Sequence, residues 1–155
     1  MRGIFWVIVL AAFGVGVWML ATTISVVPQK KMCFVGHNAA PDVCVWVKVA
    51  AIESDQVRGL SGKWFMPEQV GMLFVYDEAQ FLSFWMKQMR FGLDFVWLRD
   101  DQVVDITENV GRPRTIDAER TTVAPQVPAD AVLEVNAGWV ERNGLAIGDI
   151  VSFDE

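Results

Sequence analysis

Three charged side chains interrupt an otherwise apolar stretch, residues 83–95, which reads SFWMKQMRFGLDF. Lys87 and Asp94 could share a polar pocket with a cation and a carboxylate from other segments, and such a pocket would bind a small anion or a carboxylate-bearing ligand. Burial and charge pairing shift pKa values, which is why functional groups gather in pockets of this kind. The candidate ligand-binding residues are Arg58, Lys87, Asp94 and Glu134.

The same charges also have a structural explanation. If the stretch forms a strand, its side chains alternate between two faces, so Lys87 and Arg90 point to opposite sides. Asp94 could pair with Arg58 or cap a turn, while Lys87 extends past Trp85 into solvent. The spacing favours this structural interpretation, and the pocket stays open as the alternative.

A hydrolase is a further alternative. Buried carboxylates can act as general acid and base, here Asp94 and Glu134, with Lys87 or Arg58 orienting cell-wall or sugar material. No nucleophilic triad is indicated, because the single histidine, His37, falls in a predicted hairpin turn. Phosphate-loop and dinucleotide-binding motifs are absent. We therefore expect no catalytic residues and a protein that acts by binding.

Soft metal ligands occur in the sequence without a typical spacing. Met86 and Met89 form an M-x-x-M motif, and together with His37 they would suit Cu(I). The two methionines face opposite ways on a strand, however, and methionine is common core filler. No His or Cys spacing is typical of zinc. We expect no metal site and no cofactor, and a metal or small-ligand carrier is the third functional alternative.

Trp64 and Phe65 are adjacent in a predicted loop that Pro67 interrupts. Tryptophan is frequent in this chain, with seven in 155 residues. Aromatic side chains that stay exposed are typical of contact surfaces between proteins. We expect Trp64 and Phe65 to form a partner surface.

The two cysteines, Cys33 and Cys44, flank a turn-forming segment. If residues 32–36 and 43–50 form a hairpin, the two side chains can lie opposite each other. An even number of cysteines in an oxidising compartment favours a disulfide. The alternative is two buried thiols.

Residues 1–29 are expected to form an N-terminal transmembrane signal anchor. No charged residue lies between Arg2 and Lys30, and the run GIFWVIVLAAFGVGVWMLA has no polar face. About 20 apolar residues are needed to cross a bilayer as a helix. A cleaved signal peptide and a lipoprotein signal fit less well, because neither cleavage pattern is present. We expect membrane lipid to hold this segment, and residues 30–155 to lie on the periplasmic or extracytoplasmic side.

The exported part carries a strong negative charge. From residue 30 onward it holds 12 of the 13 Lys and Arg and all 19 Asp and Glu, a formal charge of −7. Nucleic-acid binding needs clustered Lys and Arg to neutralise phosphates. We expect no nucleic-acid partner.

Residues 30–155 read as one compact β-rich or α+β domain, a barrel-like antiparallel sheet with two short helices. Two hairpins are predicted, one between residues 71–77 and 80–86, and one within residues 93–107 that turns at Asp100–Asp101. The helices are expected over residues 53–60 and 137–144, the second capped by Asn136.

Three segments resemble the domain of unknown function 192 family: RGLSGKWFMPEQVGMLFVYDE, LSFWMKQMRFGLDFVWLRDDQVVDI and VLEVNAGWVERNGLAIGDIV. The resemblance implies a small β-rich fold that is often exported or membrane-anchored, and it supplies no activity. The sequence departs from the family's GLM-x-R pattern, since Ser61 replaces the Met and Lys63 the Arg, and Gln88 replaces an Asn. If the family's site uses those groups, it is altered in this chain.

Together these observations predict a membrane-anchored cell-envelope protein. We expect it to act as a non-catalytic binding or accessory subunit of an envelope or membrane protein complex. An envelope hydrolase and a small-ligand carrier are the alternatives.

Overall fold

A computed structural model describes residues 30–36, 42–114 and 122–153. The predicted anchor, residues 1–29, lies outside the described residues, and so does His37. Within the three described ranges, no helix is long and apolar enough to span a membrane.

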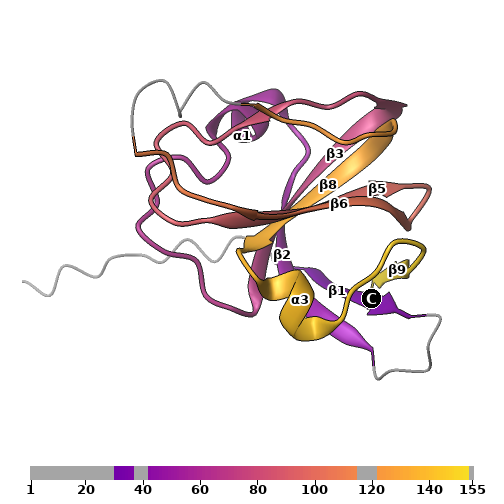
Figure 1. Cartoon of the computed structure of the whole chain (residues 1–155). Helices are drawn as coiled ribbons and strands as arrows, with labels where there is room; N and C mark the ends of the chain where they lie inside the picture. Colours follow the sequence, from indigo (N-terminus) through magenta and orange to yellow (C-terminus); the bar gives the residue numbers. More distant parts are fainter. Residues whose placement is uncertain (1–29, 37–41, 115–121, 154–155) are drawn as a thin grey trace, which may run out of the picture.

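Seven strands form a closed barrel in the order β1-β2-β3-β8-β5-β6-β9 (Figure 1). The barrel strands are β1 (Lys30–Val35), β2 (Val43–Ala50), β3 (Val70–Gln80), β5 (Leu93–Arg99), β6 (Gln102–Val110), β8 (Ala129–Asn136) and β9 (Ile150–Phe153). A small second sheet and two short helices complete the fold: β4 (Phe84–Trp85), β7 (Thr122–Val123), α1 (Glu53–Arg58) and α3 (Trp139–Asn143). The β-rich, barrel-like fold with two short helices is therefore confirmed.

The barrel is not wholly antiparallel, which corrects the predicted fold class. β2 and β3 are parallel, with Trp46 opposite Val70 and Ala50 opposite Phe74. Parallel neighbours need a long crossover between them. Residues 51–69 supply it, and this connection contains α1.

The predicted hairpin between residues 71–77 and 80–86 is wrong. β3 continues to Gln80 and pairs with the distant β8, while β4 pairs with β7. Pairing with β8 lets β3 bury both of its faces, through Met72 and Phe74 on one side and Leu73 on the other. A local hairpin would not bury that much apolar surface.

Two hydrophobic cores lie on the two sides of the central strands. The first core fills the barrel, and α3 contributes Trp139 and Val140 to it. The second core lies outside the barrel, where Leu60, Met86 and Met89 pack on the outer face of β3, β8 and β5. We call these overlying segments, α1 with residues 59–66 and 81–91, the covering layer. Strands buried on both faces are apolar almost throughout, as β5 is.

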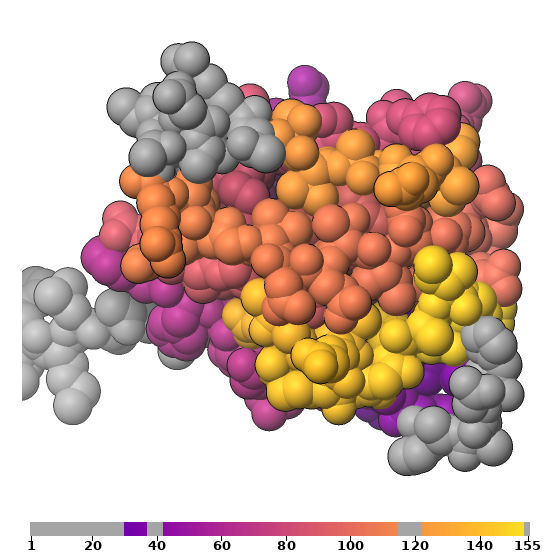
Figure 2. Space-filling model, in the orientation of Figure 1, coloured from indigo at the N-terminus to yellow at the C-terminus, as the bar shows by residue number. Residues whose placement is uncertain are grey.

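Contacts near the C-terminus close the barrel. Figure 2 shows β6 (orange) and the C-terminal segment (yellow) meeting on one face of the molecule. Backbone hydrogen bonds join them, from the Val103 N–H to the Asp149 carbonyl at 2.9 Å and from the Val151 N–H to the Asp101 carbonyl at 2.7 Å.

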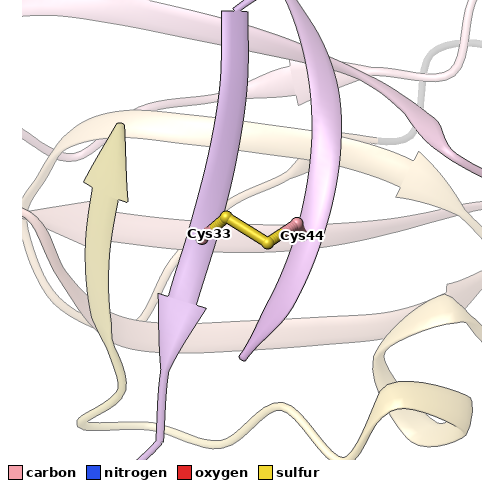
Figure 3. The surroundings of a disulfide bond; sticks show 2 residues. All are labelled: Cys33 and Cys44. Atoms are coloured by element: carbon pink, nitrogen blue, oxygen red, sulfur yellow. A yellow bond between two sulfur atoms is a disulfide. The ribbon is translucent and has the colours of Figure 1, made fainter. Parts of the chain in front are cut away.

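A disulfide joins Cys33 on β1 to Cys44 on β2 (Figure 3). The two residues lie directly opposite each other in the antiparallel register. The bond thus cross-links the two N-terminal strands of the barrel.

Candidate functional site

Asp94 and Glu134 lie on adjacent strands, β5 and β8, but point to opposite faces of the sheet. Glu134 is opposite Phe95, whereas Asp94 is opposite Val135. Directly opposed residues share a face. Phe95 belongs to the second core and Val135 to the first, so Glu134 faces the covering layer and Asp94 faces the barrel interior.

The carboxylate of Asp94 is fully engaged in holding backbone. Its Oδ1 accepts hydrogen bonds from the N–H of Asn109 at 2.7 Å and of Gly138 at 3.1 Å, and its Oδ2 accepts one from Val140 N–H at 3.0 Å. Two of these donors belong to the beginning of α3, whose first N–H groups need acceptors. Asp94 therefore has the turn-capping role of the structural interpretation, and it pairs with no Arg58 side chain.

The carboxyl group of Glu134, unlike that of Asp94, accepts no hydrogen bond from the described residues. Its side chain is only 5% exposed, and among the described residues none donates a hydrogen bond to its carboxyl group. Burial raises the pKa of Glu134 to about 8 because the charged form loses its hydration. No fully buried side-chain oxygen of the described residues lacks a hydrogen-bond partner, so the carboxyl oxygens of Glu134 border accessible space. A largely buried carboxyl group without a donor is unusual, and it marks a candidate functional group.

Glu134 lines a narrow chamber between the sheet and the covering layer. This inner chamber has a volume of about 20 Å³, close to the space that one water molecule needs. Phe74 and Glu134 line it from the sheet, and α1 contributes Arg58 at its C-terminal end. The covering segment contributes Phe84, Trp85 and Met89.

A wider outer chamber of about 280 Å³ adjoins the inner one. Four residues line both chambers, Gln56, Val57, Phe84 and Trp85, and Tyr76 and Ser83 complete the outer chamber. We call the two chambers together the Glu134 pocket. Burial raises the pKa of the Tyr76 hydroxyl, and the nearby charge of Glu134 raises it further.

Two hydrogen bonds fix the position of the covering layer beside this pocket. One joins α1 to β3, and the other joins the two segments of the covering layer to each other. The Gln56 side-chain amide donates to the Val75 carbonyl on β3 at 3.0 Å. The Ser61 hydroxyl donates to the Lys87 carbonyl at 2.9 Å. Gly59 ends α1 with a φ of 49°, and a Cβ there would lie 3.4 Å from the Phe74 ring. The positive φ is the reason that glycine is favoured at this position.

The four predicted ligand-binding residues do not converge on one point. Arg58 and Glu134 line the same chamber, and Asp94 lies on the other face of the sheet. Lys87 is exposed, and its Nζ lies 5.4 Å from the centre of the Trp85 ring. The structure thus keeps one carboxyl and one cation of the predicted set in the pocket.

Trp64 and Phe65 protrude from the covering layer, 75% and 74% exposed. The guanidinium carbon of Arg90 lies 3.6 Å from the centre of the Trp64 ring, a cation–π contact that restrains this tip. Beside it, Phe65 lines a groove of about 220 Å³ together with Lys48, Met66 and other residues. We call Trp64 and Phe65 the aromatic tip.

A second cavity of similar size opens at the end of the barrel. It measures about 300 Å³ and is lined by five aliphatic and two aromatic side chains together with Asp100, Asp101 and Asp130. Asp130 already accepts a hydrogen bond from the Asp100 N–H at 3.0 Å. This cavity presents no buried polar group comparable to Glu134.

Within the described ranges, no group of three or more His, Cys, Asp and Glu side chains is placed to hold a metal ion. Met86 and Met89 are both buried in the second core.

Comparison with protein families identifies the family of this chain. The model of the DUF192 family, described as an uncharacterized ACR, matches residues 35–153. The chain belongs to the DUF192 family. No curated protein matches the chain significantly.

Two solved structures share the fold of this DUF192 protein. One is a candidate transcription regulator from Sinorhizobium meliloti 1021, with 26% identity and a TM-score of 0.72, over 81% of this chain and 94% of that one. The other is a protein of unknown function from Novosphingobium aromaticivorans DSM 12444, with 24% identity and a TM-score of 0.73, over 84% of this chain and 89% of that one.

Residues of the three segments that resemble the DUF192 family line the Glu134 pocket. The Gly59–Lys63 turn contributes Gly59, Leu60 and Ser61 to the lining. The sequence pattern does not point to Tyr76 or Phe84, which it predicts only as strand residues. A signal was available for Tyr76, because it is the only tyrosine in the chain.

Proposed function

We propose that this DUF192 protein is a non-catalytic binding protein whose Glu134 pocket holds a small ligand. The observation that supports this most directly is Glu134 itself, buried and without a hydrogen-bond partner among the described residues, beside a chamber that adjoins a wider one. A ligand that supplies the missing partner would offset the unfavourable burial of the carboxyl group.

Binding is favoured over hydrolysis by the position of Asp94. A two-carboxylate mechanism needs both groups to face the same substrate. Glu134 faces the covering layer, while Asp94 faces the other side of the sheet with both oxygens hydrogen-bonded to backbone. The acid–base pair of the hydrolase alternative is therefore not assembled.

We further propose that residues 1–29 tether the domain to a membrane and that the domain lies on the extracytoplasmic side. The uncharged apolar run between Arg2 and Lys30 supports the tether. The Cys33–Cys44 disulfide supports an oxidising compartment. A bound tether would raise the local concentration of the domain near other envelope proteins.

The accessory-subunit role is the second candidate function, and the aromatic tip favours it. Trp64 and Phe65 are the most exposed large hydrophobic side chains among the described residues. Aromatic residues restrained in advance are effective anchors at protein interfaces. In this proposal, a membrane protein of the same envelope contacts the tip.

The regulator role named for the Sinorhizobium meliloti protein is not proposed for this chain. A regulator that binds DNA needs a basic surface. From residue 30 onward the formal charge is −7.

The binding function is tested by screening the full chain in mild detergent against a chemically diverse fragment set with ligand-observed NMR. We expect hits that Glu134→Gln weakens and that the matched control Glu78→Gln, at an exposed position on β3, does not. A screen without any hit sensitive to Glu134→Gln would contradict the function.

The accessory role is tested by co-purification of the full chain from membranes in mild detergent. We expect a stoichiometric complex that the Trp64→Ala, Phe65→Ala double variant loses. Phe81→Ala is the matched control, because Phe81 is also strongly exposed and lies outside the tip. Recovery of a monomer alone from the wild type would contradict this role.

A further inference from the structure

We propose that the ligand of the Glu134 pocket is a primary amine, with its ammonium group in the inner chamber and its organic body in the outer chamber. This inference rests on the proposed binding function. It names the chemistry of the ligand from four features of the pocket: the charge that Glu134 can carry, the size of the inner chamber, the aromatic walls, and the composition of the outer chamber.

The first feature is the partner that Glu134 lacks. An ionised carboxylate only accepts hydrogen bonds, so it needs donors, and a buried carboxylate is best stabilised by a cation that also donates. No described residue supplies such a donor to Glu134. A primary ammonium group supplies three N–H donors and a positive charge in one small group.

The same feature argues against the anionic ligand that the sequence suggested. An anion in the inner chamber would meet the Glu134 carboxyl and would be repelled once that group ionised. The one cation in the lining, Arg58, is at the exposed end of α1. A ligand that enters as far as Glu134 is therefore expected to be positively charged.

Size restricts the kind of cation. The inner chamber holds about 20 Å³, which is the space of about one water molecule. An ammonium group is of that size, whereas a trimethylammonium group is several times larger. The chamber therefore favours primary amines over quaternary ones.

The walls suit a cation as well. Phe74, Phe84 and Trp85 line the inner chamber, and the faces of aromatic rings attract cations. The chain itself provides an internal example, because the Lys87 ammonium lies 5.4 Å from the centre of the Trp85 ring. An ammonium group in the chamber would lie among these aromatic side chains.

The outer chamber fits a short organic body. Val57, Phe84 and Trp85 provide apolar surface, while Gln56, Tyr76 and Ser83 provide hydrogen-bonding groups. An alkyl chain of a few carbons, with or without hydroxyl groups, matches this mixture.

Amine binding would be coupled to proton release. Burial holds the Glu134 pKa at about 8, so the carboxyl group is mostly protonated at pH 7. It must lose that proton to pair with an ammonium group. Two other ionisable groups lie close to this event, Tyr76 on β3, whose pKa is raised above 10, and Arg58 on α1, which is a competing cation at the pocket.

The pH dependence follows from these groups. Affinity for an alkylamine should rise by about tenfold for each pH unit up to about pH 8, as Glu134 ionises, and then level off. It should fall again only when the amine itself loses its charge, near a pKa of about 10 as for Lys.

The test compares n-butylamine, n-butanol and butyltrimethylammonium as probes of the full chain in mild detergent, by calorimetry and ligand-observed NMR. We expect n-butylamine to bind at least tenfold more tightly than the other two, and to release close to one proton per amine at pH 7. Glu134→Gln should weaken n-butylamine at least tenfold, and Glu78→Gln should not. Arg58→Ala, which leaves Glu134 in place, should tighten binding by a few-fold because a competing cation is removed.

The outcomes separate this inference from the function on which it rests. If n-butanol or butyltrimethylammonium binds as well as n-butylamine, or if Arg58→Ala weakens amine binding, the amine assignment is wrong. If another class of ligand binds in a way that depends on Glu134, the binding function stands and the amine assignment fails. If nothing binds, both fail.

Discussion

Glu134 and Asp94 lie on neighbouring strands of the barrel and carry the same functional group, yet they point to opposite faces of the sheet. Asp94 is satisfied by three backbone N–H donors. Glu134 has no donor among the described residues. The two carboxyl groups therefore have separate roles, one in stability and one at a pocket.

Replacing Asp94 should destabilise the fold strongly. In Asp94→Ala, the N–H groups of Asn109, Gly138 and Val140 lose their acceptor inside the protein, and each unsatisfied buried group costs about 1–3 kcal/mol. We expect the free energy of unfolding, measured with urea, to fall by about 3–5 kcal/mol. Asp77→Ala, at an exposed position on β3, is the control and should change it by less than about 0.5 kcal/mol. Equal effects of the two substitutions would show that the three hydrogen bonds contribute little.

The stability of the protein should depend on pH through Glu134. The Glu134 pKa is about 8 in the folded protein, against 4.5 for a fully hydrated glutamate, so between these values the folded state holds a proton that the unfolded state has lost. The free energy of unfolding of the wild type should therefore fall as pH rises from about 4.5 to 8, by up to about 1.4 kcal/mol per pH unit. Glu134→Gln has no carboxyl group that titrates at this position, so its free energy of unfolding should rise relative to that of the wild type over that pH range. Urea titrations at pH 5, 6, 7 and 8 measure the difference, and a constant difference would count against the raised pKa.

Two tryptophans should respond differently to truncation. Trp97 is fully buried in the second core and donates to the Thr107 hydroxyl at 3.0 Å, so Trp97→Ala should cost about 3–5 kcal/mol of unfolding free energy. Trp64 is exposed and makes a cation–π contact with Arg90, so Trp64→Ala should cost no more than about 1 kcal/mol. Chemical denaturation of both variants distinguishes them. A large loss for Trp64→Ala would mean that the aromatic tip is part of the fold and not a contact surface.

Removing the disulfide should destabilise the barrel without changing its architecture. Cys33 and Cys44 are 11 residues apart and cross-link β1 to β2. A cross-link of this loop length typically contributes about 2–4 kcal/mol, largely by restricting the unfolded chain. We expect a loss in this range for the Cys33→Ser, Cys44→Ser double variant by urea unfolding. Thiol labelling of protein isolated from membranes should require prior reduction, and labelling without it would place the domain in a reducing compartment.

Local patterns in the sequence predict the parts of this fold that depend on neighbouring residues. The hairpin of β5 and β6 turns at Asp100–Asp101, where both residues have positive φ, and the run of β-branched and aromatic residues on either side predicts it. The pairing of Cys33 with Cys44 follows from the same kind of local register. The positions of both short helices are also predicted from local residues, although the cap of the second is not.

Contacts between distant segments were not predictable in the same way. β3 pairs with β8, which is about 50 residues further along the chain, so the local hairpin expected for β3 does not form. α3 is capped by Asp94 from β5 and not by Asn136, whose side-chain amide instead donates to the Met66 carbonyl at 2.9 Å. The candidate site also depends on contacts between distant segments, which local sequence patterns do not predict. The sequence identified Arg58 and Glu134, but the strand register decides that Asp94 faces away.

The central claim is that Glu134 is a buried, unpartnered carboxyl group at a ligand pocket, and carboxyl-carbon NMR tests it most directly. The full chain, labelled at glutamate side chains, is titrated with and without saturating n-butylamine, and Glu134→Gln assigns the signal. We predict a Glu134 pKa of about 8 in the free protein and a fall of at least two units with the amine bound. A Glu134 pKa near 4.5 in the free protein would contradict the account.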